Sequence, residues 1–326
     1  MSEQSITSVI MPVYNRPDYL EKAIDSVLNQ TVDSWELIIA DDASEKATQK
    51  ILEKYAKFEQ VKKYSNPKNI GLFANLNQAI SKSQGNSILL LCSDDFLLPE
   101  CLRKSRELLR EYPESGLLLS PHETVNSENK ELASSSIYYY DQFVLKSIQT
   151  LNSEESIPLL LKYGSINGNL TGMFFKRSLF EQIGGFREEW YQVSDWEWVY
   201  RAAKHSPILI SKTPRVVIRS HPEQLSGINF KNLRNSLEVI EMVEILLNDP
   251  YISQLEEAHR WALHIMQLHL WYAFKFAWQG HWSEALAIAK AVNQVTGFSR
   301  TLWAMIRWLP QRWQIYRQRK FPLPPA

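Results

Sequence analysis

Apolar and polar positions follow two alternating periods along the first hundred residues of the chain. Residues 8–14 form a short β-rich run, and Pro17 then opens a segment whose apolar residues recur at helical spacing. The same order of a strand and then a helix returns at residues 35–40 and 46–58. This part of the chain therefore reads as repeated β-α units.

The pattern continues with one more strand, a third helix and a buried strand. The strand is predicted at residues 61–65, the helix at residues 72–80, and the buried strand at residues 87–92. Parallel strands need helical crossovers, which also cover the apolar faces of the sheet. We predict an α/β fold with a mostly parallel, Rossmann-like sheet flanked by helices, and a ligand site at the carboxyl ends of its strands.

The character of the chain changes twice beyond the β-α units. Residues 164–175 mix Gly, Asn and apolar residues, as a loop entering a strand does. Beyond residue 227, helical periodicity dominates residues 232–247, 254–278 and 282–292. We therefore expect two parts, an α/β domain over residues 1–227 and a helical C-terminal region over residues 228–326.

Bulk composition excludes several classes of protein. The 326 residues carry no net charge and are 44% hydrophobic, which excludes a disordered chain and gives no general case for nucleic-acid binding. Cys92 and Cys101 have no partner pattern for zinc or a disulfide framework, which fits a reducing compartment. Residues 1–7 are polar, and residues 261–278 are too polar for a membrane span. We expect a cytoplasmic protein.

Two pairs of carboxylates follow predicted strands. Asp41 and Asp42 end the second strand, while Asp94 and Asp95 end the fourth. The carboxyl ends of parallel strands meet at one edge of a sheet, so we expect the two pairs to converge there. Each pair also suits a simpler role, because carboxylates at strand ends often cap the next helix.

Several short motifs now combine into a family resemblance. Their order and spacing resemble family 2 glycosyltransferases of the GT-A fold over about residues 6–227. The motifs are Ser8-Val-Ile-Met-Pro-Val-Tyr-Asn15, Ile38-Ile-Ala-Asp-Asp-Ala-Ser44, Asn69-Ile-Gly71, Cys92-Ser-Asp-Asp95 with Pro99, Ile183-Gly-Gly-Phe186, Ser194-Asp-Trp-Glu197 and Arg219-Ser-His221. The resemblance implies transfer of a sugar from a nucleotide-sugar donor to an acceptor hydroxyl, typically in capsule, exopolysaccharide or lipid-linked oligosaccharide synthesis.

The resemblance also assigns residues to the donor. In the family, the carboxylate that matches Asp41 accepts a hydrogen bond from the imide N–H of uracil or thymine, which favours UDP or dTDP. Asp42 either shares the donor site or caps the helix that follows. The matching donor positions are Pro12, Val13, Tyr14, Asn15, Asp41, Asp42, Gly71, Asn77, Ser93 and Asp95.

The family's metal motif is Asp-x-Asp, and this chain has Cys92 in place of its first carboxylate. Asp94 matches the position that binds Mn²⁺ or Mg²⁺, and such ions commonly take only one or two protein carboxylates. His221 matches a position that can complete the metal or diphosphate site, although a lone His is more often structural. The missing carboxylate leaves a second hypothesis open, a catalytically silent protein that binds sugar nucleotides.

Asp195 matches the family's catalytic base, which implies an inverting transfer with no covalent intermediate. The neighbouring Trp190 and Trp196 suit an acceptor site, because flat aromatic faces pack against sugar rings, and they equally suit an aromatic core. For Trp198 we prefer the core. The acceptor class is a saccharide or a lipid-linked saccharide.

The C-terminal tail combines positive charge with tryptophan. No acidic residue follows Glu284. The tail instead alternates basic residues and Trp, namely Arg300, Trp303, Arg307, Trp308, Arg312, Trp313, Arg317, Arg319 and Lys320. This pattern predicts either peripheral contact with an anionic membrane surface at the inner face or a helix that packs its Trp residues internally.

Overall fold

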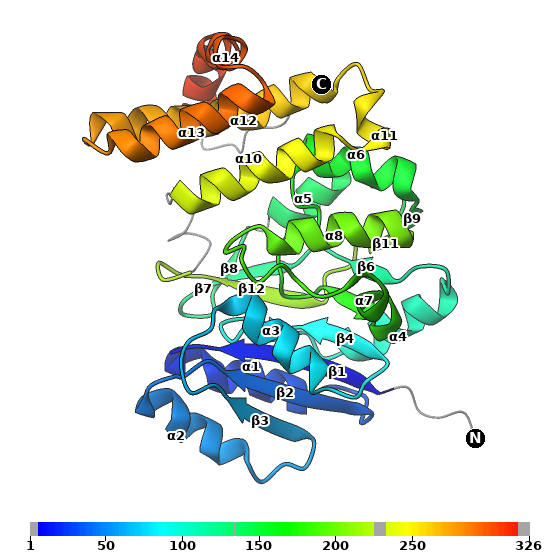
Figure 1. Ribbon diagram of the computed structural model, residues 1–326. Helices are drawn as coiled ribbons and strands as arrows, with labels where there is room; N and C mark the ends of the chain where they lie inside the picture. The colour runs from blue at the N-terminus through cyan, green and yellow to red at the C-terminus, as the bar shows by residue number, and fades with distance from the viewer. Residues whose placement is uncertain (1–5, 134, 225–232, 319–326) are drawn as a thin grey trace. The chain divides into compact units, whose positions relative to one another are not determined.

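The computed structural model describes residues 6–133, 135–224 and 233–318, without the side chains of residues 135, 137 and 310–318. The chain forms two compact units (Figure 1). The sheet unit comprises residues 1–153, 167–190 and 194–222, and the helical unit comprises residues 154–166, 191–193 and 223–326. The predicted boundary at residue 227 lies outside the described residues.

The larger sheet has eight strands in the order β3-β2-β1-β4-β10-β6-β11-β9. Its first four strands in this order are parallel, and the register places Val13 beside Asp41 at their carboxyl ends. The strands are β1 (Thr7–Val13), β2 (Trp35–Asp41), β3 (Val61–Ser65), β4 (Ser87–Leu90), β6 (Leu117–Leu119), β9 (Ile148–Leu151), β10 (Phe174–Lys176) and β11 (Ile208–Ser211). The α/β fold with a mostly parallel sheet is confirmed.

Two strands of the larger sheet depart from a parallel arrangement. Strand β10 runs antiparallel to both β4 and β6, and β9 runs antiparallel to β11. The strand predicted at residues 87–92 ends earlier, at Leu90. The N–H of Cys92 donates to the hydroxyl of Thr171 instead of to a neighbouring strand, so the chain leaves the sheet just before the Asp94-Asp95 turn.

A second sheet begins directly after that turn. Its order is β5-β12-β7-β8, with β5 (Phe96–Leu97), β12 (Val216–Ser220), β7 (Glu123–Asn126) and β8 (Glu131–Leu132). Strand β12 pairs with β5 and β7. The Asp94-Asp95 turn therefore lies between the two sheets and is held from both sides.

Helices flank the sheets, and the first three along the chain lie where the periodicity predicts them. They are α1 (Pro17–Leu28), α2 (Lys46–Tyr55), α3 (Leu72–Ser81), α4 (Cys101–Glu111), α5 (Ser135–Asp141), α7 (Arg177–Ile183) and α8 (Ser194–His205). Helix α1 buries Leu20, Ile24 and Val27 completely, and each such side chain contributes about 1.5–3 kcal/mol. Helix α3 packs on β1 and β2 (Figure 1), so the strands that carry the carboxylates are fixed by a continuous core.

The helical unit contains α6 (Ser153–Tyr163), α10 (Leu233–Leu247), α11 (Pro250–Ser253), α12 (Ala258–Trp278), α13 (Trp282–Val295) and α14 (Phe298–Gln318). Helix α12 packs against α10, α13 and α14, which confirms the predicted helical character. Glu238 on α10 accepts the backbone N–H groups of Tyr191 (2.6 Å) and Gln192 (2.8 Å). These bonds explain why residues 191–193 belong to this unit.

No helix in the described ranges of the chain combines the length and the apolar character that a membrane crossing requires.

Candidate active site

The turn after β4 gathers three potential ligand side chains. The Sγ of Cys92 and carboxylate oxygens of Asp94 and Asp95 lie within 4.8 Å of one another. Asp95 is 3% exposed, and it accepts the Thr171 hydroxyl at 2.6 Å and the Arg219 backbone N–H at 2.9 Å. Burial, and then the charge of Asp94, raise the pKa of Asp95. Asp95 is an internal anchor, with both oxygens bonded to the protein.

Asp94 is the open carboxylate of the turn. Its side chain is 18% exposed, and its Oδ2 lies 3.1 Å from Nε2 of the buried His221. Its Oδ1 has no hydrogen bond to any described residue. The His221 ring packs on Tyr19 with ring centroids 4.9 Å apart, and Arg219 holds the Asp94 carbonyl at 2.9 Å. The backbone is fixed while one carboxylate oxygen stays free for a ligand.

The donor atoms fit a hard divalent cation at Asp94. Mn²⁺ and Mg²⁺ prefer oxygen ligands, and Mn²⁺ also accepts imidazole. Burial, with a further contribution from Asp95 and Asp94, raises the pKa of the Cys92 thiol well above its ordinary value. A neutral thiol is a poor ligand for these ions. Asp94 and His221 therefore fit the metal, and Cys92 does not.

Asp195, the candidate catalytic base, lies in the first turn of α8. Its Oδ2 accepts the side-chain N–H of Asn167 at 2.9 Å, and its Oδ1 accepts the Trp196 backbone N–H at 2.8 Å. Burial raises the pKa of Asp195 above the ordinary value of 3.8, against the effect of both hydrogen bonds. Its charge also raises the pKa of Cys92, so Asp195 lies within electrostatic reach of the turn after β4.

The segment from Asn167 to Thr171 bonds both Asp195 and the turn after β4. Asn167 orients Asp195, while four residues later Thr171 donates to Asp95 and accepts from Cys92. Sequence reasoning missed both residues, and the only signal for them is the Gly- and Asn-rich composition of residues 164–175. This loop therefore fixes the geometry between the candidate metal site and the candidate base.

The first carboxylate pair is bonded entirely to the protein. Asp41 accepts the Ser44 backbone N–H at 3.1 Å and the Gln49 side chain at 2.5 Å. Asp42 accepts the backbone N–H groups of Ile70 (2.9 Å) and Gly71 (3.0 Å). The alternative that Asp42 caps α2 is wrong, because its oxygens hold the loop before α3 and α2 begins without a side-chain cap.

Of the segment Pro12 to Asn15, which is predicted to line the pocket for the nucleotide base, Tyr14 is the most exposed. Pro12 and Val13 lie buried within β1, whereas Tyr14 is 50% exposed. Asn15 adopts a left-handed conformation with φ 48°, and its side chain accepts the Glu45 N–H at 2.7 Å. The loop thus presents Tyr14 outward and uses Asn15 to fix the start of α2.

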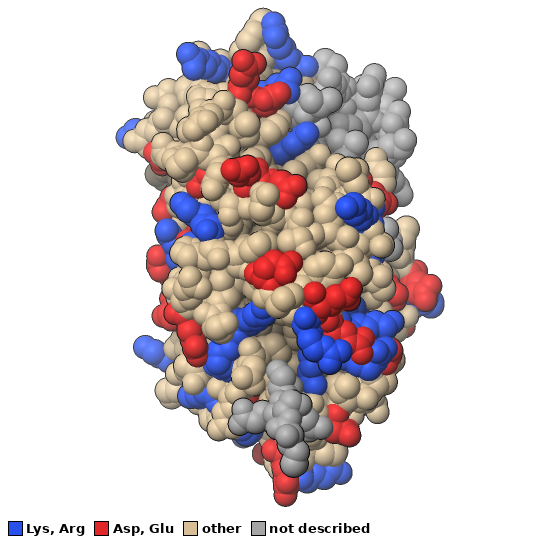
Figure 2. Space-filling view, turned by 90° about the vertical axis from the view of Figure 1, so that its right-hand side faces the viewer, with Lys and Arg blue, Asp and Glu red and all other residues tan. Residues whose placement is uncertain are grey.

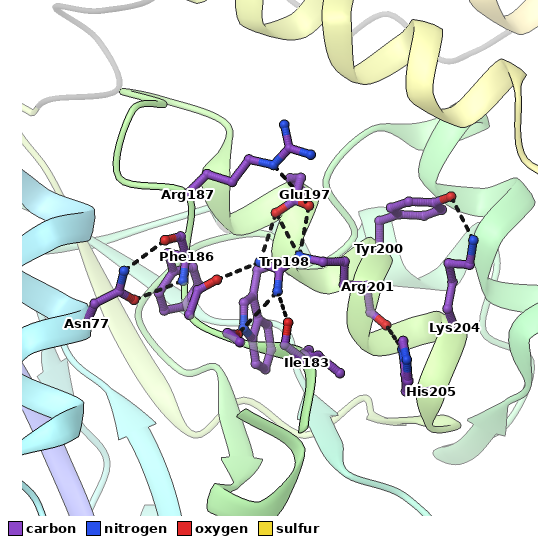
Figure 3. A network of polar contacts seen from close by, with 12 residues as sticks. Asn77, Ile183, Phe186, Arg187, Glu197, Trp198, Tyr200, Arg201, Lys204 and His205 are labelled. Carbon is purple, nitrogen blue, oxygen red and sulfur yellow. Dashed lines mark hydrogen bonds and ion pairs between the residues drawn. The ribbon is translucent and has the colours of Figure 1, made fainter. Parts of the chain in front are cut away.

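Two further residues predicted to bind the nucleotide sugar, Asn77 and Ser93, are bonded to the protein or buried. Asn77 donates to the Phe186 carbonyl and accepts the Phe186 N–H, both at 2.8 Å (Figure 3). It also donates to Glu188 at 3.0 Å. Ser93 is 6% exposed. The side chain of Asn77 joins α3 to residues 186–188. The predicted contacts of Asn77 and Ser93 with the nucleotide sugar therefore stay predictions.

The three tryptophans differ in their surroundings. Trp198 is fully buried, donates to the Gly184 carbonyl at 3.0 Å and packs on Phe175, which confirms its core role. Trp190 and Trp196 are each 5% exposed. The Nε1 of Trp196 is buried without a hydrogen-bond partner in the described part of the chain, so its ring is enclosed while its N–H is left unbonded.

Glu197 shares the first turn of α8 with Asp195 but has a structural role. Its carboxylate is 3% exposed and pairs with Arg201 at 2.8 Å and Arg187 at 3.3 Å (Figure 3). Arg201 in turn donates to the Gly185 carbonyl at 2.6 Å. This network fixes the segment before α8, and it commits Glu197 to two cations.

Comparison with known proteins decides the family. Residues 8–184 match the model described as glycosyl transferase family 2, which is more than half of the chain. The chain belongs to glycosyl transferase family 2. The matched range contains the turn after β4 and the Asn167 segment, and the family resemblance of the sequence is confirmed.

Curated glycosyltransferases match about a third of the chain. The putative teichuronic acid biosynthesis glycosyltransferase TuaG of Bacillus subtilis is 37% identical over 107 residues, which cover 32% of this chain and 42% of TuaG. The putative glycosyltransferase EpsE of the same organism is 36% identical over 107 residues, 32% of this chain and 38% of EpsE. The chain thus spans less than half of these relatives.

Solved structures extend the likeness to nearly the whole chain. Residues 1–349 of S. aureus TarS, in complex with UDP-GlcNAc, share 19% identity at a TM-score of 0.66, covering 97% of this chain and 92% of that one. The mannosyltransferase PcManGT from Pyrobaculum calidifontis, in complex with GDP-Man and Mn²⁺, shares 16% identity at a TM-score of 0.57, covering 94% and 87%. At these identities the likeness establishes the GT-A fold alone.

Proposed function

We propose that this protein is an inverting glycosyltransferase that moves a sugar from a nucleotide-diphosphate sugar to an acceptor hydroxyl. The observation that carries the proposal is the Asn167–Thr171 segment, which bonds the buried base candidate Asp195 on one side and the Asp95 anchor of the metal turn on the other. The base must lie close to the metal that holds the leaving diphosphate, because reacting groups held in position react far faster than groups that meet by diffusion.

Asp195 acts as the general base in this proposal. The acceptor O–H proton passes to its carboxylate while the acceptor oxygen bonds to the anomeric carbon and the diphosphate leaves with the electron pair of the broken C–O bond. Burial raises the pKa of Asp195, and a higher pKa makes a carboxylate a stronger base. The unpartnered N–H of Trp196 donates to an acceptor oxygen, and the indole of Trp190 encloses the acceptor.

Asp94 and His221 hold the divalent ion, Mn²⁺ or Mg²⁺. When bound, the ion offsets negative charge on the leaving diphosphate. Glu197 is committed to Arg201 and Arg187, so Asp195 is the one carboxylate of the first turn of α8 that is left for the reaction. A single carboxylate supports direct displacement with inversion rather than a covalent glycosyl-enzyme.

The donor preference is for UDP or dTDP, through Asp41 and the outward-facing Tyr14 beside it. Asp41 keeps lone pairs beyond its two bonds, because a carboxylate offers about four acceptor positions. TuaG is named for teichuronic acid biosynthesis, which supports a role in cell-surface polysaccharide or glycolipid synthesis. A thermal-shift screen of sugar nucleotides with Mn²⁺ tests the donor: a UDP- or dTDP-sugar should stabilise the protein, and stabilisation by GDP-sugars alone would refute the preference.

A catalytically silent sugar-nucleotide-binding protein is the second hypothesis, and Cys92 supports it. The family's first metal-motif carboxylate is absent there. Donor hydrolysis in the presence of Mn²⁺ separates the two, because a silent protein binds donor without turnover. Under the transferase hypothesis, Cys92→Asp restores a carboxylate and should leave turnover equal or higher. Activity that appears only in Cys92→Asp would favour the silent protein.

We also propose that the helical unit contacts an anionic membrane surface at the cytoplasmic face, where a lipid-linked acceptor resides. Trp278, Trp282 and Trp303 are 92%, 70% and 57% exposed, and Arg307 lies 5.1 Å above the Trp303 ring. Exposed Trp beside basic residues favours lipid interfaces. Trp308 packs instead against His264, while the side chain of Trp313 and the whole of Arg319 and Lys320 lie outside what is described.

Truncation after Gly297 tests the membrane proposal. Sedimentation with anionic liposomes should fall strongly in the truncated protein and at high salt, because both the Trp and the Arg residues of α14 are lost or screened. Neutral liposomes are the control and should bind neither form well. Unchanged sedimentation of the truncated protein with anionic liposomes would contradict the role of this segment.

A further inference from the structure

A cavity of about 730 Å³ opens at the amino edge of the sheet, opposite the edge that carries the carboxylates. Ser87 begins β4 and Lys176 ends the antiparallel β10, and both line the cavity. The loop before β2 contributes Ser34, and α4 contributes several long side chains. At the opposite edge, Asp41 is the last residue of β2 and Asp94 follows the end of β4. The cavity is therefore separate from the candidate active site and lies wholly within the sheet unit.

The lining of this cavity is strongly cationic. Five basic residues face two carboxylates, and the basic set is Arg103, Arg106, Arg110, Lys176 and Arg177. Glu107 is already paired with Arg103 at 2.8 Å, which leaves Glu181 as the other carboxylate. Figure 2 looks onto this side of the sheet unit and shows Lys and Arg side chains gathered there. The cavity thus carries an excess of positive charge.

Two of the guanidinium groups are fixed in place by neutral oxygens. Arg106 donates to the hydroxyls of Thr7 (2.8 Å) and Ser34 (2.7 Å), and Arg177 donates to the Gly85 carbonyl and the Ser83 hydroxyl, both at 2.6 Å. Neither forms an ion pair with a described residue. Three of the five N–H groups of each guanidinium are used. Both groups are rigid, charged and still able to donate.

Of the other three cations, Arg103 is paired with Glu100 and Glu107, whereas Arg110 and Lys176 form no ion pair with a described residue. Arg110 is exposed and makes no hydrogen bond or ion pair with any described residue. Lys176 donates to the neutral Pro113 carbonyl. Burial lowers the pKa of Lys176 against the opposing charge of Glu114. Burial alone lowers the pKa of Arg106, which is the effect expected for a cation that lacks a compensating anion. An anion in the cavity would supply that compensation.

We propose that this cavity is a second ligand site, which binds a phosphate-bearing molecule independently of the donor and its metal. Phosphate presents several acceptor oxygens and two negative charges, which match rigid guanidinium forks and nearby hydroxyl donors. The volume suits a ligand of nucleotide or phosphosugar size. The ligand source is either a free nucleoside diphosphate or a phosphate-bearing polymer.

Calorimetry with inorganic pyrophosphate in excess EDTA tests the site, because chelation removes metal-dependent binding at Asp94. The wild-type protein and Asp94→Ala should bind alike, and Arg110→Ala with Lys176→Ala should weaken binding by about tenfold or more. Lys104→Ala is the matched control, since Lys104 is an exposed cation of the same helix outside the cavity, and it should bind as the wild type does.

The same titration with UDP and with inorganic polyphosphate distinguishes the two kinds of ligand. Tighter binding of UDP indicates a nucleotide, and tighter binding of polyphosphate indicates a polymer. The single variant Arg110→Ala serves if the double variant does not fold. No heat of binding in EDTA, full binding by the Arg110 and Lys176 variants, or an equal loss in Lys104→Ala would each overturn the proposal. None of these outcomes bears on sugar transfer, which is measured separately with metal present.

Discussion

The two carboxylate pairs at the strand ends look alike in sequence and differ in the folded chain. Asp41 and Asp42 are 1% and 3% exposed, and every carboxylate oxygen of the pair accepts a hydrogen bond from the protein. In the second pair, Asp95 is equally enclosed, whereas Asp94 keeps one oxygen without a partner among the described residues. Position after a strand brings four carboxylates to one edge, but only Asp94 keeps a carboxylate oxygen that bonds no described residue.

The difference separates stability from chemistry. A carboxylate that accepts several backbone N–H groups fixes a loop. Its removal leaves buried N–H groups without a hydrogen-bond acceptor. A partly exposed carboxylate with a free oxygen contributes little to folding and can accept a cation. The comparison therefore predicts opposite effects for substitutions at Asp42 and Asp94.

The largest expected effect is the loss of transfer in Asp94→Ala. Charge stabilisation by a metal is worth several kcal/mol, so turnover with Mn²⁺ should fall by about three orders of magnitude, and the metal dependence of donor binding should disappear. The free energy of unfolding should change by no more than about 0.5 kcal/mol. Metal-dependent UDP affinity equal to that of the wild type would break the comparison.

The second effect is a loss of stability in Asp42→Ala. The substitution leaves the Ile70 N–H without its acceptor and removes one of the two acceptors of the Gly71 N–H and of the Asn66 amide, which keep Asn69 and Asn75. We expect the free energy of unfolding to fall by about 2–4 kcal/mol, as measured by urea denaturation. A fully stable variant with lost donor affinity would instead make Asp42 a ligand of the donor.

A smaller effect on the transfer rate is expected for Asn167→Ala, and it tests whether Asp195 is the catalytic base. The Asn167 hydrogen bond lowers the pKa of Asp195, while burial raises it above 3.8. The base must be ionised, so transfer falls as pH drops through this raised pKa. Removing Asn167 should raise the pKa further, move the acid limb of the pH–rate profile to higher pH and slow transfer by about tenfold. An unmoved acid limb would show that another group titrates.

Periodicity and strand-end position predicted much of the fold and part of the site. The apolar face of α1 is buried as its spacing requires, and β1, β2 and β3 lie where short β-rich runs occur. These features depend on neighbours in sequence. The family motifs also placed Asp94 and His221 together, and the structure brings them to 3.1 Å.

Features that depend on remote contacts were not predictable. Asn167 and Thr171 lie in an aperiodic loop, and their partners are 28 and 76 residues away. Asn77 bonds Phe186, which is 109 residues distant. The antiparallel β10 follows from tertiary pairing with β4 and β6, because three residues carry too little pattern to set direction.

Single-turnover transfer by Asp195→Asn, with donor affinity measured in parallel, tests the central claim most directly. Asparagine keeps the size and polarity of the side chain but cannot take the acceptor proton. The account predicts a fall in transfer rate of about 10²–10⁴-fold at nearly unchanged donor affinity. Glu197→Gln serves as the comparison and should lower stability, because its carboxylate is buried between two Arg residues, with little change in the rate of folded protein. Full transfer by Asp195→Asn with the native acceptor would contradict the account.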